Sequence, residues 1–186
     1  MTKTQHNDRN GLALFWMVIG VLARLIPHPA NMTPMASISL FGGTHLSKAK
    51  AFSLGFATMV ISDILIAYFQ GNPVFGLWSF FTYSGFAAII FAGSFLRNNP
   101  SAGRTLGYLL GSSLGFWIWT NFGVWATGEH QLYAHTFEGL VSCYVSALPF
   151  LRNALVGDLG FGLVFFLSFS YARKTAAQYG YTVQGA

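Results

Sequence analysis

Four charged residues lie inside or at the rim of long apolar segments, where ionisable side chains are costly to bury. They are Arg24, Asp63, Arg152 and Asp158. Charged residues make up only 8% of the chain, and ionisable groups at membrane depth usually serve a site or neutralise one another. Two cations and two anions balance, so the sequence leaves two interpretations open. These residues either form ion pairs that join helices, or line a polar pocket for a solute.

Further polar and aromatic residues are expected near the same end of the apolar segments. His28 and Asn31 occupy a proline-rich turn after the first segment, and Asn121 and Trp125 lie near the end of a later one. Convergent polar groups with aromatic walls are typical of a small-molecule pocket. His28 could ligate a metal such as cobalt, or it could be an ordinary hydrogen-bonding residue of the turn.

Six apolar segments are expected to form the helices that position these residues. The predicted ranges are 11–26, 33–45, 51–69, 74–96, 105–126 and 153–171. A spanning helix needs about 20 apolar residues, so the second segment is short for a span. A further amphipathic helix is expected over residues 136–147, at the interface or packed on the bundle. The sequence therefore predicts an all-α membrane protein built as a six-transmembrane-helix bundle.

Lys and Arg residues alternate between the gaps, which predicts the orientation of the bundle. The basic gaps are the N-terminal tail, residues 46–50, residues 97–104 and the C-terminal tail. They all fall on one side if every segment crosses, and the positive-inside rule places both termini in the cytoplasm. The predicted division is a tail over 1–10, one membrane domain over 11–174 and a second tail over 175–186. The Lys and Arg residues are scattered, so the expected partner is the lipid membrane and no nucleic acid is expected.

Glycine recurs at every fourth position in the fifth segment. The residues are Gly103, Gly107, Gly111 and Gly115. This spacing places them on one face of a helix, where small residues let helices approach closely in a membrane. The stripe is expected to pack against another helix of the same chain, with a seam for a second copy or a partner subunit as the alternative.

The chain lacks the motifs that would support catalysis. No P-loop, nucleophile elbow or metalloprotease helix occurs in a suitable context. Cys143 is the only cysteine, and its apolar surroundings predict a buried, inert thiol. A redox enzyme that used Cys143 with His130 and His135 would need that thiol exposed. We therefore expect a protein that is not an enzyme and has no resident cofactor.

Several short motifs resemble those of one known family. They are residues 24–36 with 40–43, 62–63, 120–125 and 148–153. Together they resemble a family of small six-helix membrane proteins (DUF6580), which is itself similar to the substrate-binding S-components of energy-coupling-factor vitamin transporters. The resemblance implies an S-component-like fold in the bacterial inner membrane. It also implies uptake of a vitamin-like solute, with cobalamin or a related corrinoid as the transported ligand.

The resemblance to the solitary cobalamin-uptake S-components also suggests ligand-binding residues. By that resemblance, His28, Asp63, Tyr83 and Arg152 match positions that line a corrinoid pocket. Those proteins have a cobalt-ligating cysteine in the segment that matches residues 78–83, and this chain has none there. A different vitamin or precursor is therefore an open alternative, as is a non-transporting scaffold subunit. S-components can also dock to a shared transmembrane and ATPase module, which is a further possible partner.

Overall fold

A computed structural model gives the arrangement of most of the chain. The residues it describes are 15, 18–19, 22–25, 29–71, 73–128 and 132–178. The predicted N-terminal tail, residues 179–186 of the predicted C-terminal tail and most of the first predicted helix, His28 included, lie outside these residues, whereas residues 175–178 continue the last helix. Residues 22–25 of the first segment are helical.

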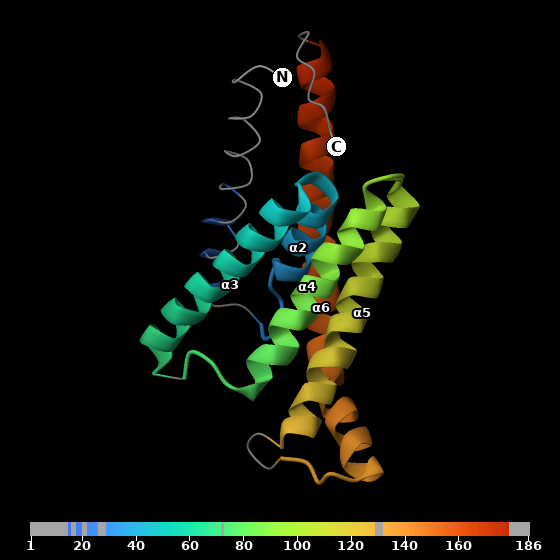
Figure 1. Cartoon of the computed structure of the whole chain (residues 1–186). Coiled ribbons are helices and arrows are strands. Elements are labelled where there is room, and N and C mark those ends of the chain that lie inside the picture. The colour runs from blue at the N-terminus through green and yellow to red at the C-terminus, as the bar shows by residue number, and fades with distance from the viewer. Residues whose placement is uncertain are drawn as a thin grey trace.

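The described secondary structure is entirely helical, as predicted (Figure 1). The helices are α2 (Met35–His45), α3 (Lys48–Gln70), α4 (Leu77–Leu96), α5 (Ala102–Thr127) and α6 (Phe137–Gln178). Successive helices run in alternating directions, so the α2–α3 and α4–α5 junctions lie at the same end as the C-terminal part of α6. This end, called the basic end below, carries Lys48, Lys50, Arg97 and Arg104. The structure thus gathers at one end the basic gaps that it describes.

Three of the described helices are long and apolar enough to cross a membrane. They are α3, α4 and the part of α6 over Phe137–Tyr171. This finding identifies the chain as a membrane protein. The fifth predicted segment does form a long helix, α5, but its glycine, hydroxyl and amide residues make it less apolar than the other three.

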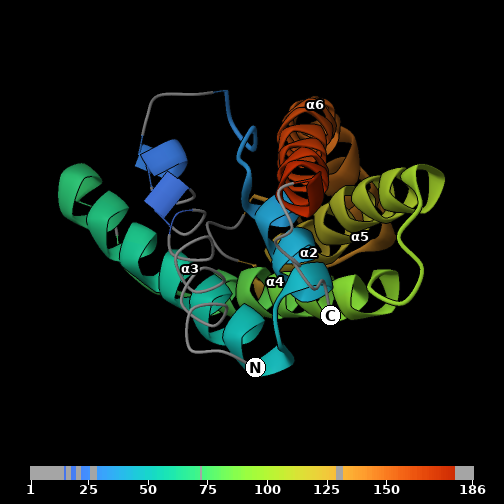
Figure 2. The ribbon, with the colours of Figure 1, turned by 90° about the horizontal axis from the view of Figure 1, so that it is seen from above.

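The second predicted segment forms a short helix at the centre of the bundle rather than a full span. The 11 residues of α2 extend about 16 Å at 1.5 Å per residue, roughly half the thickness of a bilayer core. This helix contacts α3, α4, α5 and α6, and the view from above shows it among them (Figure 2). Met35 and Leu40 of α2 pack with Met59, Phe86 and Leu109 in the core.

A close crossing of α2 and α4 depends on two glycines. A Cβ atom on Gly43 would lie 2.0 Å from the carbonyl oxygen of Ile90, and one on Gly93 would lie 2.4 Å from that of Leu40. No side chain fits between these two backbones. Small residues at such a crossing let dispersion forces act over a close contact in lipid, where no hydrophobic drive brings helices together.

Arg97 closes the C-terminal end of α2 from the neighbouring helix. Its Nε donates to the carbonyl oxygen of Thr44 at 3.1 Å, and Nη2 donates to those of Gly43 at 2.9 Å and Leu46. The last carbonyls of a helix have no partner within the helix, and a cation there also complements the helix dipole. Arg97 therefore holds the end of α2, besides being one of the basic residues that indicate the orientation of the bundle in the membrane.

We expect Arg97→Met to destabilise the protein by about 2 kcal/mol, because hydrogen bonds from a charged donor to the end of a short buried helix are lost. Thermal unfolding in mild detergent measures this change. Arg104→Met is the matched control, since Arg104 belongs to the same basic end but is exposed. Equal unfolding temperatures for the two variants would show that the bonds from Arg97 add no stability.

The predicted amphipathic helix over 136–147 and the predicted helix over 153–171 are one helix in the structure. α6 runs for 42 residues with Pro149 inside it. The prediction of two separate helices was therefore wrong. A proline inside a helix normally breaks it, by removing an N–H donor and crowding the preceding turn. Here the helix continues through Pro149, and the part before it packs beside the end of α5 (Figure 1).

Candidate functional site

Three separate stretches of sequence meet in one buried polar group, which we call the Arg24 cluster: Arg24, Ser62, Asp63 and Tyr83. Nη2 of Arg24 lies 2.7 Å from Oδ1 of Asp63, and the hydroxyl of Tyr83 donates to Oδ2 at 2.7 Å. Nη1 of Arg24 donates to the hydroxyl of Ser62. That hydroxyl donates to the carbonyl oxygen of Thr58 in its own helix at 2.7 Å, so a lone pair is left for the arginine.

The Arg24 cluster compensates its own charge. The Asp63 side chain is only 5% exposed, whereas the Arg24 side chain is 19% exposed. Each carboxylate oxygen of Asp63 has a donor, so burial leaves neither without a partner. Removing one member of a buried ion pair leaves a charge without compensation. Within the ion pair, the Arg24 side chain is the more exposed member and the one that an acceptor on a solute can reach.

Aromatic side chains border the Arg24 cluster on one side. The ring of Tyr83 lies 5.8 Å from that of Phe56 and 6.3 Å from that of Phe75, measured between centroids. The cluster therefore has an apolar wall beside its charged groups. This combination suits an amphiphilic solute, because apolar lining with a few polar groups is the usual composition of a ligand pocket.

Asp158 lies apart from the Arg24 cluster. It is 5% exposed, and its Oδ2 lies 2.6 Å from the hydroxyl oxygen of Ser113, within hydrogen-bond distance. The hydroxyl of Ser37 donates to the backbone carbonyl of Asp158, also at 2.6 Å. Arg152 is exposed and makes no ion pair or hydrogen bond with another described residue. The expected single layer of charges is therefore divided: Arg24 and Asp63 are together, while Asp158 and Arg152 are elsewhere.

Asn31 belongs to a turn that is fastened to α6. Its φ is 63°, in the left-handed region that asparagine tolerates, and the backbone N–H of Met32 donates to the carbonyl oxygen of Pro29 at 3.0 Å. Asn153 reaches across from α6 and donates to the carbonyl oxygen of Ala30 at 3.0 Å. Two motifs far apart in the sequence thus meet, and Asn31 shapes the connection between them.

Asn121 and Trp125 bond near the junction of α5 and α6 rather than in the Arg24 cluster. Asn121 donates to the carbonyl oxygen of Trp117 in its own helix at 2.8 Å. Trp125 donates to the carbonyl oxygen of Ala134 at 3.0 Å. Cys143 is buried as predicted, and its sulfur lies 3.4 Å from the carbonyl oxygen of Asn121. The exposure that a redox role for this thiol would need is not present.

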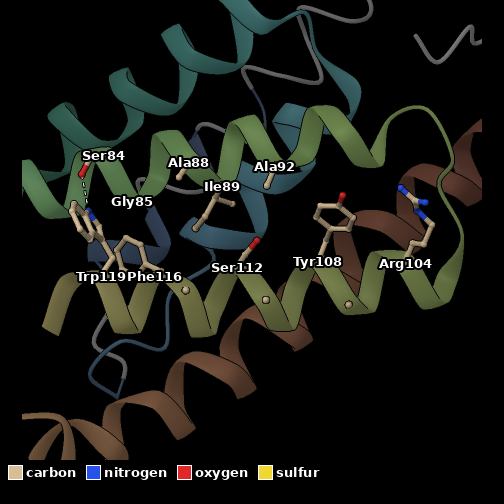
Figure 3. Close-up of a pocket in the computed structure, with 13 residues that line it drawn as sticks. Ser84, Gly85, Ala88, Ile89, Ala92, Arg104, Tyr108, Ser112, Phe116 and Trp119 are labelled. Carbon is tan, nitrogen blue, oxygen red and sulfur yellow. Dashed lines mark hydrogen bonds between the residues drawn. The ribbon is translucent and has the colours of Figure 1, made fainter. Parts of the chain in front are cut away.

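A groove of about 950 Å³ runs between α4 and α5 (Figure 3). None of the predicted ligand-binding residues lines it. Arg104 lies toward one end of the groove and Trp119 toward the other, where the indole N–H donates to the hydroxyl of Ser84 at 2.8 Å.

The glycine stripe faces this groove rather than another helix. Three of its residues, Gly107, Gly111 and Gly115, line the groove. A Cβ atom added at any of the four glycines would meet no described atom within 4 Å. The expectation that the stripe packs against another helix of the chain is therefore wrong for the described structure. Regular spacing predicted a shared face but not what the face contacts.

Ser37 and Ser113 are site residues that sequence reasoning missed. Single serines in apolar segments carry no spacing signal, because their hydroxyls commonly bond to their own helix. Ser62, by contrast, did have a signal in the sequence, because it directly precedes Asp63. Among the described residues, no group of three or more His, Cys, Asp and Glu side chains could hold a metal ion. His28, the predicted cobalt ligand, lies outside the described residues.

Comparison with known proteins identifies a family for almost the whole chain. The sequence model of a family of unknown function (DUF6580) matches residues 4–179. No curated protein and no solved structure matches the chain. The chain therefore belongs to the DUF6580 family of unknown function.

Proposed function

We propose that this protein is a membrane transport protein of the S-component type that binds and takes up a vitamin-like solute. The observation that carries the proposal is the Arg24 cluster, in which a buried ion pair and a tyrosine hydroxyl join three stretches of an otherwise apolar bundle. Ionisable groups at this depth are expensive to keep and are functional candidates for that reason. The partly exposed guanidinium and the aromatic wall supply the polar and apolar contacts that a solute needs.

The charge distribution supports an orientation for uptake. The basic end faces the cytoplasm under the positive-inside rule. Asp63 lies in the half of α3 away from Lys48 and the basic end, so the Arg24 cluster is nearer the opposite surface. In the bacterial inner membrane, which the family resemblance suggested, that surface faces the periplasm or the exterior. A solute arriving from outside would therefore reach the cluster first.

The chemistry of the cluster favours a solute with a flat apolar part and an acceptor group. An arginine presents a planar set of donors that suits carboxylate, phosphate or amide oxygens, and rings stack beside it. Cobalamin or a related corrinoid is the first solute to test, and other vitamins or precursors follow. No hydrolytic step is assigned to this chain, so energy from ATP would have to come from a separate module.

The test is solute binding to the full chain purified in lipid nanodiscs, with cobalamin first and then a panel of vitamins. We expect Tyr83→Phe to weaken binding about tenfold, because Asp63 loses the hydroxyl that holds its carboxylate in place within the cluster. Tyr108→Phe is the matched control, because Tyr108 lines the separate groove between α4 and α5. Saturable binding that is equal in both variants would move the solute away from the Arg24 cluster.

A second candidate function is a non-transporting scaffold subunit, and the open glycine groove favours it. A helix of a partner subunit could lie against the small residues of α5, as helices do at such stripes in membranes. Gly111→Leu would fill the groove and dissociate a native complex without changing solute binding. Absence of any bound solute, together with such a dissociation, would favour this function over transport.

A further inference from the structure

Asp158 is a buried carboxyl group without a cation beside it among the described residues. The helices packed against α6 are α2 and α5. The groups they place against Asp158 are Ser37 and Ser113, and neither carries a charge. On α6 itself the nearest ionisable residue is Arg152, less than two turns away and exposed.

Other titratable side chains on these helices lie farther along them. On α2 the nearest is His45, about two turns beyond Ser37, and on α5 it is Tyr108, more than one turn before Ser113. An ionised carboxylate here would have only neutral donors, and burying a charge without an opposite charge is strongly unfavourable.

A count of hydrogen atoms assigns a proton to this site. The hydroxyl oxygen of Ser113 lies 3.1 Å from the carbonyl oxygen of Leu109 and 2.6 Å from Oδ2 of Asp158. A serine has one hydroxyl hydrogen, so it can donate to only one of these acceptors. Ser37 also approaches Asp158, through its hydroxyl and its backbone N–H, but it does not give Ser113 a second hydrogen. A protonated Asp158 that donates to Ser113 fills both contacts of Ser113 at once, without a shared hydrogen.

We propose that Asp158 is a proton-binding site within the membrane domain. With the proton bound, the carboxyl donates to Ser113, which donates to Leu109. When the proton leaves, Ser113 turns its hydrogen to the carboxylate, and the contact with Leu109 is lost. A proton fits this site better than a metal ion. Two oxygen ligands at right angles, each about 2.0 Å from a small cation, are about 2.8 Å apart, farther than the 2.6 Å found here.

The position of Asp158 connects protonation to the turn that leads to the Arg24 cluster. The preceding residue, Gly157, lies so close to this turn that a Cβ atom on it would be 3.2 Å from the Cα of Met32. Asn153, earlier on the same helix, holds the carbonyl oxygen of Ala30. A change at Asp158 that shifts α6 therefore acts on the turn. Coupling of proton binding to solute uptake rests on the proposed function, whereas protonation of Asp158 does not.

Infrared difference spectroscopy of the full chain in nanodiscs tests the proton site directly. The chain has only five Asp and Glu residues, so the carboxylic acid C=O region is simple. At neutral pH we expect a band that is lost in Asp158→Asn and retained in Asp63→Asn, the control with an ion-paired carboxylate. No such band in the unmodified protein, or a band that persists in Asp158→Asn, would overturn the proposal.

A second variant keeps the test decisive if Asp158→Asn does not fold. Ser113→Ala removes the acceptor of the carboxyl proton, so the band should shift in frequency, and an unmoved band would count against the site. A band that responds to added Na⁺ at fixed pH would also overturn it. In liposomes, an acid exterior should increase solute uptake by the unmodified protein but not by Asp158→Asn. If the spectra are as expected and no solute is taken up, the transport function fails while the proton site stands.

Discussion

Gly43→Ala is expected to destabilise the protein by about 3 kcal/mol or more, the upper end of the cost of overpacking. The added methyl would lie 2.0 Å from the carbonyl oxygen of Ile90, which is backbone and cannot rotate away. The α2–α4 crossing would have to separate, and α2 is the helix around which the others pack. Thermal unfolding in detergent, followed by helical circular dichroism, measures the effect.

Gly111→Ala is the matched control for this prediction. Its added methyl would meet no described atom within 4 Å, and alanine is more favourable than glycine in a helix by about 0.5–1 kcal/mol. The control should therefore unfold at the same temperature or slightly higher. Equal destabilisation by both substitutions would contradict the close α2–α4 contact. Destabilisation by Gly111→Ala alone would show that another helix fills the groove in the native assembly.

The contact between Gly43 and Gly93 shows why the helices could be predicted from the sequence and the contacts between helices could not. Apolar length and the turn residues gave α3 and α4 nearly at their observed limits, because both signals are local. Gly43 and Gly93 lie in different helices, and no spacing in the sequence relates them. The stripe on α5 had a regular spacing and was given the wrong neighbour. Periodicity identifies a face, whereas contact depends on how separate helices are placed.

The same difference between local features and contacts applies to the candidate site. The sequence limits the charged residues at membrane depth to a few, and energetic cost requires their compensation, so a pair between Arg24 or Arg152 and Asp63 or Asp158 was one expected arrangement. The sequence could not specify which cation pairs with which anion. Arg152 lies on the exposed side of α6, and Asp158 uses serines instead. A serine in a helix ordinarily bonds to a carbonyl of the same helix, so its presence in the sequence does not indicate a contact with a buried carboxyl group.

Asp63→Ala should destabilise the protein by about 3–5 kcal/mol, the usual cost of removing one partner of a buried ion pair. Arg24 would keep its charge without a carboxylate, and the hydroxyl of Tyr83 would lose its acceptor. Unfolding temperature in detergent measures the loss. Arg152→Met, which removes an exposed cation from α6, is the control and should change stability little.

The double variant Arg24→Met with Asp63→Leu separates a structural pair from a binding site. Replacing both members of a buried ion pair with apolar residues is often neutral for stability, so the double variant should recover most of what Asp63→Ala loses. Solute binding should not recover, because the guanidinium that a solute reaches is gone. Recovery of both stability and binding would show that the pair only joins helices. Recovery of stability alone assigns Arg24 and Asp63 to solute recognition, since the fold can then be maintained without them.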